Sequence, residues 1–268
     1  MGQLLASMIT RADLLQSAIG VEAEFLGEPP SAVDGYGLGF YHGGEVLHRK
    51  RPMFEATHLT WPAIFEGVAA SITLAHVREG TVGEARADNT HPFRMRQWLF
   101  AHHGSLEGFE AMRENILKDL PDFLQRNIRG DTDSEHIFHV VLSFLHDAGQ
   151  IDVQDATDRA VIGALQSTIA LLDRHANEVG APCGQLNLTL TNGRALFLVR
   201  RGAPFHFIVR DRLPDDVEGP DGRSVGPVRY LVALSHKLET PPLGYLEIPE
   251  GQIARIDREL GIAYFPVG

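Results

Sequence analysis

Short apolar runs alternate with polar residues at both ends of the chain, whereas helical spacing dominates its middle. Residues 4–8 form an apolar run of the length of a buried strand, and residues 11–19 predict a short helix. Strand-forming residues recur at 71–78 and 97–102. Both of these predicted strands finish on polar residues, so a functional site can form where they end.

A glycine-rich stretch over 34–39 precedes the first predicted hairpin. Gly43-Gly44 supplies a tight turn between residues 40–41 and the strand predicted at 45–48. The glycine pattern is similar to a phosphate-binding fingerprint, but that fingerprint follows a strand and opens a helix. Here the pattern leads into a strand, so we expect a glycine-rich approach loop instead.

Three helices are predicted in the middle of the chain, over 106–117, 133–146 and 153–177. The second begins with acidic residues, which suits the positive end of the helix dipole. The third carries one apolar stripe at spacings of three and four residues, typical of a helix face packed on the core. The stripe consists of Val161, Leu165, Ile169 and Leu172.

Short strands return after residue 182. An alternating pattern predicts a hairpin of 185–191 with 195–200, in which Asn192-Gly193 provides a type I′ turn. Acidic residues, Pro and Gly dominate 211–224, which we predict to be a mobile surface loop. Further strands are predicted at 205–209, 229–234 and 245–248.

Strands, then helices, then strands again predict an α+β protein built on two largely antiparallel sheets packed face to face between helical layers. The chain shows no internal repeat and no interdomain linker. We therefore expect a single domain over residues 1–268.

Composition narrows the classes of function. The chain has 268 residues and a net charge of -11, which disfavours a nucleic-acid surface or an anionic membrane surface. Its single cysteine, Cys183, excludes an internal disulfide framework and a cysteine-rich zinc site, and fits a reducing, cytoplasmic compartment. No apolar segment approaches the roughly 18 residues that a membrane span needs.

Neither a metal nor a cofactor is expected. His102 and His103 could offer nitrogen ligands, but adjacent strand residues point to opposite faces, and a zinc site needs at least three ligands. Arg78, at the end of a predicted strand, could grip a carboxylate with two hydrogen bonds, although a surface ion pair is the usual state of such a residue.

Five polar motifs follow one another in a fixed order: 34–41 (DGYGLGFY), 76–83 (HVREGTVG), 89–93 (NTHPF), 100–106 (FAHHGSL) and 130–135 (GDTDSE). Together they resemble the class II, or N-terminal-nucleophile, glutamine amidotransferases. Residues 187–193 (NLTLTNG) and 232–235 (VALS) extend the likeness to the compact, stand-alone bacterial members, so it covers nearly the whole chain.

The resemblance implies a four-layer αββα fold and a glutamine site at the end of the sandwich. In that family an N-terminal cysteine attacks the side-chain amide, with its own α-amino group as general base. Matched residue by residue, Arg78 is expected to grip the substrate α-carboxylate, with Thr81 nearby. Asp133 is expected to hold the α-ammonium group, and Gly104 to give a backbone N–H to the oxyanion hole.

Two departures from the family pattern fall at the reacting atoms. Gly2 occupies the position of the cysteine, and His103 occupies the position of the asparagine that helps to stabilise the oxyanion. Losing one oxyanion donor typically costs about a hundred- to a thousandfold in rate, whereas losing the nucleophile removes the covalent route.

Other residues offer weak substitutes. Ser7 lies too far along the first predicted strand, and Cys183 has no active-site motif around it and is expected to be a small buried hydrophobe. His103 could itself act as a hydrogen-bond donor or a base, because imidazole titrates near neutrality, but a base still needs a nucleophile or a positioned water.

Three hypotheses follow. The first is a catalytically silent protein that binds glutamine, glutamate or a γ-glutamyl compound as a sensor, or as the partner of an active enzyme or of a second copy. The second is an active amidohydrolase whose native residue 2 is cysteine. The third is an interaction scaffold with a vestigial cleft. The second change, at His103, favours natural loss of activity over an engineered Gly2.

Overall fold

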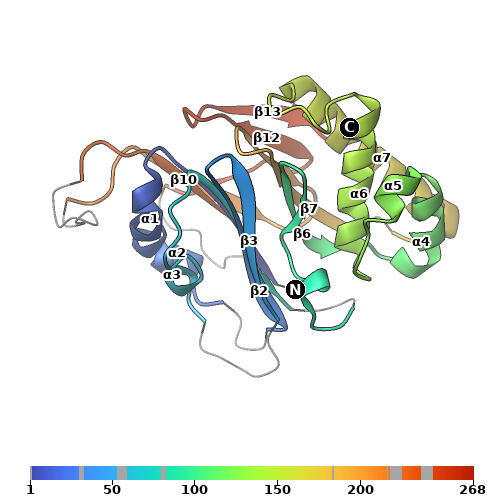
Figure 1. Ribbon diagram of the computed structural model, residues 1–268, viewed down its shortest axis with the longest axis horizontal. Helices are drawn as coiled ribbons and strands as arrows, with labels where there is room; N and C mark the ends of the chain where they lie inside the picture. The colour runs from blue at the N-terminus through green and yellow to red at the C-terminus, as the bar shows by residue number, and fades with distance from the viewer. Residues whose placement is uncertain are drawn as a thin grey trace.

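The computed structural model describes residues 2–29, 33–52, 59–79, 83–182, 184–215, 217, 225–236 and 244–268. Two antiparallel sheets lie face to face, with one group of helices on the outer face of each (Figure 1). The order of layers is helix, sheet, sheet, helix. The predicted α+β class and the αββα arrangement are therefore confirmed.

The first sheet contains seven strands among the described residues, in the order β11-β9-β10-β1-β4-β2-β3. β1 lies between β10 and β4, so the start of the chain is built into the centre of this sheet. The strands are β1 Gln3–Ile9, β2 Gly35–His42, β3 Glu45–Pro52, β4 Ile72–Arg78, β9 Phe205–Arg210, β10 Tyr230–Ser235 and β11 Leu246–Glu247.

The second sheet contains six strands among the described residues, in the order β13-β12-β8-β7-β6-β5. Its central pair, β6 and β7, is antiparallel, and β6 lies across β1 and β4 of the first sheet. The strands are β5 Phe93–Met95, β6 Trp98–Ser105, β7 Gln185–Thr191, β8 Leu196–Arg200, β12 Gln252–Ile256 and β13 Ile262–Pro266.

Short helices cover the first sheet and longer helices cover the second (Figure 1). Those on the first sheet are α1 Leu15–Val21, α2 Ala23–Leu26 and α3 Trp61–Ile64. Those on the second are α4 Phe109–Lys118, α5 Asp122–Gln125, α6 Asp133–Asp147 and α7 Asp158–Val179. Single 3₁₀ turns occur at η1 Ala12–Leu14 and η2 Ala87–Asn89.

Successive side chains of a strand point to opposite faces of its sheet, so the core has three layers. Leu5 of β1 packs toward the short helices, whereas Leu4 and Ala6 pack between the two sheets. In β6, Phe100 faces the long helices and Leu99 faces the first sheet. Because both faces of these strands are buried, their positions are fixed from both sides, and their ends are held rigidly for a site.

Some local predictions need correction. The glycine-rich stretch over 34–39 lies largely within strand β2 and is not a loop. An ideal Cβ on Gly37 would overlap the backbone oxygen of His91, so the missing side chain lets residues 91–92 pack directly on the strand. The turn at Asn192-Gly193 is not type I′, because only Gly193 has positive φ; instead the Asn192 side chain accepts hydrogen bonds from two following backbone N–H groups.

Helix starts were also predicted too early. The helix predicted over 106–117 begins at Phe109, after Gly108 in the left-handed region, and the one predicted over 153–177 begins at Asp158, after the N-cap Thr157. Most of the loop predicted at 211–224 lies outside the described residues.

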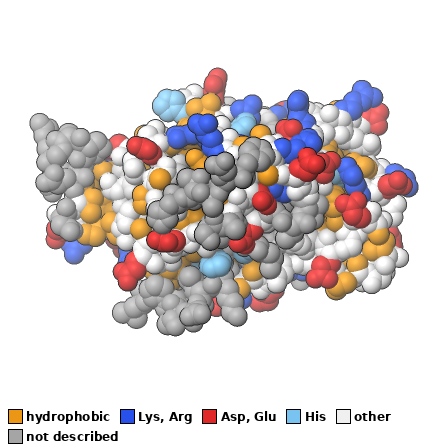
Figure 2. All heavy atoms as spheres, turned by 90° about the horizontal axis from the view of Figure 1, so that it is seen from below, with side chains coloured by type: hydrophobic (Ala, Val, Ile, Leu, Met, Phe, Trp, Pro, Cys, Tyr) orange, Lys and Arg blue, Asp and Glu red, His pale blue; other side chains and the backbone are white. Residues whose placement is uncertain are grey.

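The face shown in Figure 2 carries acidic and basic side chains side by side, and the hydrophobic side chains visible there form separate small groups. Within the described part of the chain, no helix is long and apolar enough to cross a membrane.

Candidate active site

Gly2 and Arg78 lie at the same end of two paired strands. β1 and β4 are antiparallel, and Gln3 lies opposite Val77 in their register. Gly2 is buried at the start of β1, where an ideal Cβ would overlap the backbone oxygen of Val77 and approach the nitrogen of Glu79 to 3.1 Å. The backbone therefore leaves no space for a side chain at residue 2.

Arg78 is held in place at the end of β4. Its side chain is only 5% exposed, its Nη2 donates to the backbone oxygen of Gly83 at 2.8 Å, and its Nη1 lies 3.7 Å from Asp34 Oδ2. Burial lowers the pKa of Arg78, while the Asp34 carboxylate opposes that shift. The guanidinium is thus a fixed positive charge on the residue at the end of β4, the strand that pairs with β1.

The two histidines of β6 point in opposite directions, as predicted. His102 faces the long helices, where its Nδ1 lies 2.9 Å from Ser134 Oγ and its Nε2 lies 3.0 Å from the backbone oxygen of Gln185. His103 faces the other sheet, where its Nδ1 lies 2.6 Å from Ser235 Oγ. These two rings therefore do not form a metal pair.

His103 is locked into a buried polar group that spans both sheets. Ser235 is fully buried, and its Oγ also accepts a hydrogen bond from Asn187 Nδ2 at 2.9 Å. Burial and the neighbouring His102 lower the pKa of His103 to about 3, although the Ser235 backbone carbonyl acts in the opposite direction. The ring is therefore neutral at physiological pH.

Gly104 occupies a backbone conformation that only glycine adopts readily. Its φ is +147°, and an ideal Cβ would overlap the backbone oxygen of Gln185 and lie 2.9 Å from His102 Nε2. Any side chain here would force the backbone of β6 away from β7. This steric requirement explains a glycine at the end of β6.

Asp133 connects the start of α6 to the end of β6. Its Oδ2 accepts from the backbone N–H of Leu106 at 2.8 Å, and its Oδ1 accepts from the backbone N–H of Ser134 at 2.8 Å. Thr132 caps the helix by accepting from the N–H of Glu135. A carboxylate has about four acceptor sites, so Asp133 keeps capacity for a further donor.

The predicted site residues fall into two groups at neighbouring strand ends. Gly2 and Arg78 lie at the end of the β1–β4 pair, and His103, Gly104 and Asp133 lie at the end of β6, which packs across that pair. Thr81 lies outside the described residues, so its predicted role stays a prediction.

Ser7 and Cys183 are the two candidate substitutes for a nucleophile at residue 2. Ser7 is buried inside β1, and its Oγ lies 2.5 Å from Thr73 Oγ1 on the neighbouring strand. Its hydroxyl is therefore engaged within the sheet. Cys183 lies outside the described residues.

Two more buried histidines lie beside this site. The rings of His76 and His91 are 4.2 Å apart, and burial holds the pKa of each well below its ordinary value. Among the described residues, no group of three or more His, Cys, Asp and Glu side chains is placed to hold a metal ion.

Ser235 and Asn187 were not predicted to take part in the site. Both residues belong to segments that carried the family resemblance, but Ser235 lies on β10 of the first sheet and Asn187 on β7 of the second. Asn187 lies opposite His103 in the register of β6 with β7, whereas Ser235 reaches His103 from the other sheet. Neither residue carries a local sequence signal of this contact.

This chain is similar to known proteins of one family. The family model described as "Glutamine amidotransferases class-II" matches residues 1–215. A Haemophilus influenzae protein that carries the provisional name of a glutamine amidotransferase is 24% identical over 182 residues, covering 66% of this chain and 55% of that protein. The chain thus spans about half the length of the curated relatives it matches.

Two solved structures share the fold. A glutamine aminotransferase class-II domain protein from Silicibacter pomeroyi superposes with a TM-score of 0.63 at 20% identity, over 98% of both chains. The glutamine phosphoribosylpyrophosphate amidotransferase from B. subtilis superposes with a TM-score of 0.60 at 12% identity, over 99% of this chain and 49% of that one. At these identities the likeness concerns the fold.

Proposed function

Because the chain belongs to the class II glutamine amidotransferases, we propose that it binds glutamine or a γ-glutamyl compound without hydrolysing it through a thiol. The observation that carries this proposal is Gly2, a residue without a side chain in a backbone that leaves no space for one. The binding site is the common end of β1, β4 and β6.

The chemistry of amide hydrolysis explains why this position matters. In a covalent route a nucleophile attacks the side-chain carbonyl, and the acyl group stays on the protein until water releases it. Gly2 offers no atom that can carry the acyl group, and the hydroxyl of Ser7, five residues further along β1, is engaged with Thr73. The alternative in which residue 2 is natively a cysteine requires the start of β1 to shift, because a Cβ there would overlap the backbone oxygen of Val77.

Charge in the rest of the site supports binding. An amino acid presents an α-carboxylate and an α-ammonium group, and the site offers the Arg78 guanidinium and the Asp133 carboxylate. Both side chains are almost completely buried and fixed by hydrogen bonds to backbone atoms. Fixed charges of opposite sign lose little side-chain entropy when a ligand with matching charges binds.

His103 can act in place of the asparagine amide as a hydrogen-bond donor. Asn187 donates to Ser235 Oγ, which leaves the hydroxyl proton of Ser235 available for His103 Nδ1. We assign the ring proton to Nε2 on the basis of this network. A neutral imidazole with its N–H on Nε2 would donate to the side-chain carbonyl of a bound glutamine, without acting as a base.

A protein that binds glutamine and leaves it intact would act as a sensor or as a partner of an active amidotransferase or of a second copy. We propose that residues 1–268 form one domain in this role, in the cytoplasm and without a cofactor.

Isothermal titration calorimetry with L-glutamine, L-glutamate and D-glutamine tests the proposal. We expect saturable binding of at least one L-amino acid and much weaker binding of D-glutamine, because inverting the α-carbon separates the two charged groups from Arg78 and Asp133. If none of the three binds, the proposal is wrong, and the interaction scaffold becomes the better hypothesis.

A further inference from the structure

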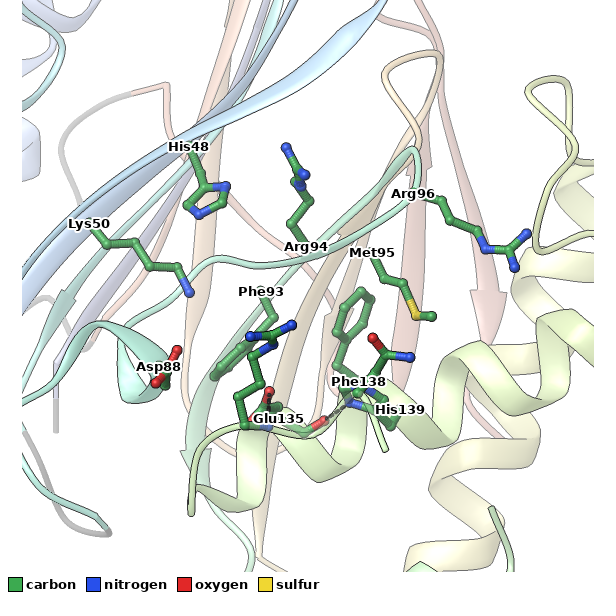
Figure 3. A pocket seen from close by; sticks show the side chains of 12 residues that line it. His48, Lys50, Asp88, Phe93, Arg94, Met95, Arg96, Glu135, Phe138 and His139 are labelled. Carbon is green, nitrogen blue, oxygen red and sulfur yellow. Dashed lines mark hydrogen bonds between the residues drawn. The ribbon is translucent and has the colours of Figure 1, made fainter. Parts of the chain in front are cut away.

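A cavity of about 440 Å³ lies at the edges of the two sheets (Figure 3). His48 and Lys50 reach it from edge strand β3, Phe93 to Met95 reach it from edge strand β5, and Glu135 and His139 reach it from α6 (Figure 3). Its volume falls within the range of small-molecule sites. The residues that line it include none of the described candidate active-site residues.

Positive charge exceeds negative charge in this cavity. Four cationic side chains line it against two carboxylates, in a chain whose net charge is -11. The cationic residues are Lys50, Arg94, Arg96 and Arg129, and the acidic residues are Asp88 and Glu135. The lining of the cavity is therefore positively charged, whereas the protein as a whole is negatively charged.

In the described part of the chain, neither carboxylate forms an ion pair with a cation that lines the cavity. Both carboxylate oxygens of Glu135 accept backbone N–H groups, from Arg129 at 3.1 Å and from Gly130 at 2.6 Å. Asp88 Oδ2 lies 3.3 Å from the guanidinium of Arg86, which is outside the cavity lining. Both acids are therefore engaged with other donors.

Three of the four cations have no counter-ion in the described part of the chain. Arg96 pairs with Asp152, whereas Arg94 only donates to the backbone oxygen of Val46. No described residue forms an ion pair with Lys50 or with the guanidinium of Arg129. The Lys50 ammonium lies 5.1 Å from the ring centre of Phe93, an aromatic contact that leaves its hydrogen-bond donors available.

The environment of Lys50 favours binding of an anion. Burial lowers the pKa of Lys50 to about 8, although Glu135 and Asp88 both act to raise it. The loss of hydration therefore lowers the pKa of Lys50 by more than these two carboxylates raise it. An anion bound beside Lys50 would supply that compensation.

We propose that this cavity binds a small phosphate monoester, with Lys50 and Arg129 contacting the phosphoryl group. A dianionic phosphoryl group matches the surplus of two positive charges, and Arg and Lys are the side chains that favour phosphate oxygens. Met95, a partly buried side chain of the lining, and the edges of the almost completely buried Phe93 and Phe138 form an apolar floor for the organic part of the ligand.

Titration of the whole chain with three probes tests this site. We expect phenyl phosphate to bind about tenfold or more tightly than inorganic phosphate, because only the ester also covers the apolar floor. Benzoate, which has the ring and a single negative charge, should bind more weakly than phenyl phosphate. Equal binding of both phosphate probes would indicate a site for free phosphate and would contradict the monoester proposal.

Variants that each remove one positive charge test where phenyl phosphate binds. Lys50→Gln and Arg129→Gln should each weaken phenyl phosphate binding by about tenfold, the effect of losing one charge-assisted hydrogen bond. Arg126→Gln is the control, because Arg126 carries the same charge three residues from Arg129 but is 81% exposed and lies outside the cavity lining. Circular dichroism verifies that each variant is folded.

Equal affinities for all four proteins would overturn the proposal, as would the absence of phenyl phosphate binding to the unaltered chain. Glutamine binding provides an independent reference, because the two sites share no described side chain. A chain that binds glutamine but not phenyl phosphate would refute the second site alone.

Discussion

At the start of β1 the backbone leaves no space for a side chain at Gly2, whereas at the end of β6 His103 and Asp133 are held by hydrogen bonds and Gly104 by a steric limit. His103 is fixed by Ser235, and Asp133 is fixed by the N–H of Leu106. The two ends of the site therefore differ in the groups that they present. Under the proposed function, the change at residue 2 is local, because His103 and Asp133 do not depend on residue 2 for their positions.

The largest effect is expected from Gly104→Ala. The added Cβ would overlap the backbone oxygen of Gln185 at a φ of +147°, so we expect a loss of more than about 3 kcal/mol in the free energy of unfolding. Gly149→Ala is the control, because Gly149 has φ +67° and open space around it; we expect it to cost about 1 kcal/mol. Urea denaturation measures both, and equal losses would contradict the steric account of β6.

Arg78→Met should reduce glutamine affinity by about ten- to a hundredfold, because a charge-assisted carboxylate contact is lost. Arg126→Met removes the same charge from an exposed position and should leave affinity unchanged. Calorimetry on both variants makes the comparison. Unchanged affinity in Arg78→Met would mean that the α-carboxylate of glutamine binds elsewhere, and the role assigned to Arg78 would be wrong.

A smaller effect concerns His103 and pH. The buried ring has a pKa of about 3, whereas an unfolded histidine has a value near 6.5, so the unfolded state binds the additional proton as pH falls below about 6.5. Stability is therefore lost on acidification. Between pH 7 and pH 5.5 this one residue should contribute a loss of roughly 1.3 kcal/mol.

His103→Asn removes that contribution, so the variant should lose correspondingly less stability than the unaltered chain between these two pH values. The other buried histidines, including His76 and His91, titrate in both proteins, and the difference between them isolates residue 103. Denaturant midpoints at the two pH values provide the data. Parallel losses would mean that folding leaves the pKa of the ring at residue 103 unchanged.

The smallest effect is expected from Gly2→Cys. A thiol at residue 2 needs a Cβ where the oxygen of Val77 stands, so we expect ammonia release to stay at background even after Met1 is removed. A colorimetric ammonia assay with mass confirmation of the amino terminus measures it. Ammonia release by this variant would show that the start of β1 moves easily and that the other end of the site is competent.

Some elements could be predicted from sequence because their signals are local. Two positive-φ glycines at Gly43-Gly44 give the β2–β3 hairpin, and the alternation in residues 185–191 gives β7. β12 and β13 were missed, since each has only five residues and β13 is largely exposed, so neither shows a clear pattern. The four-residue helices α2, α3 and α5 are too short to show helical periodicity.

The candidate site residues differ in the same respect. Ordered motifs singled out Arg78, Gly104 and Asp133 as candidates, because their spacing along the chain is a property of the sequence. The contact of His103 with Ser235 could not be predicted, since it joins strands of different sheets. The steric closure at Gly2 was also invisible, because it depends on where the oxygen of Val77 lies.

The most direct test of the account measures glutamine binding and ammonia release in the same sample of the unaltered chain. A saturating concentration of L-glutamine, established by calorimetry, is incubated with the protein, and ammonia is assayed over several hours against a buffer control. The account predicts saturable binding with ammonia at the level of the control. Ammonia that rises in proportion to protein concentration would contradict it, because the chain would then hydrolyse glutamine without a side chain at residue 2.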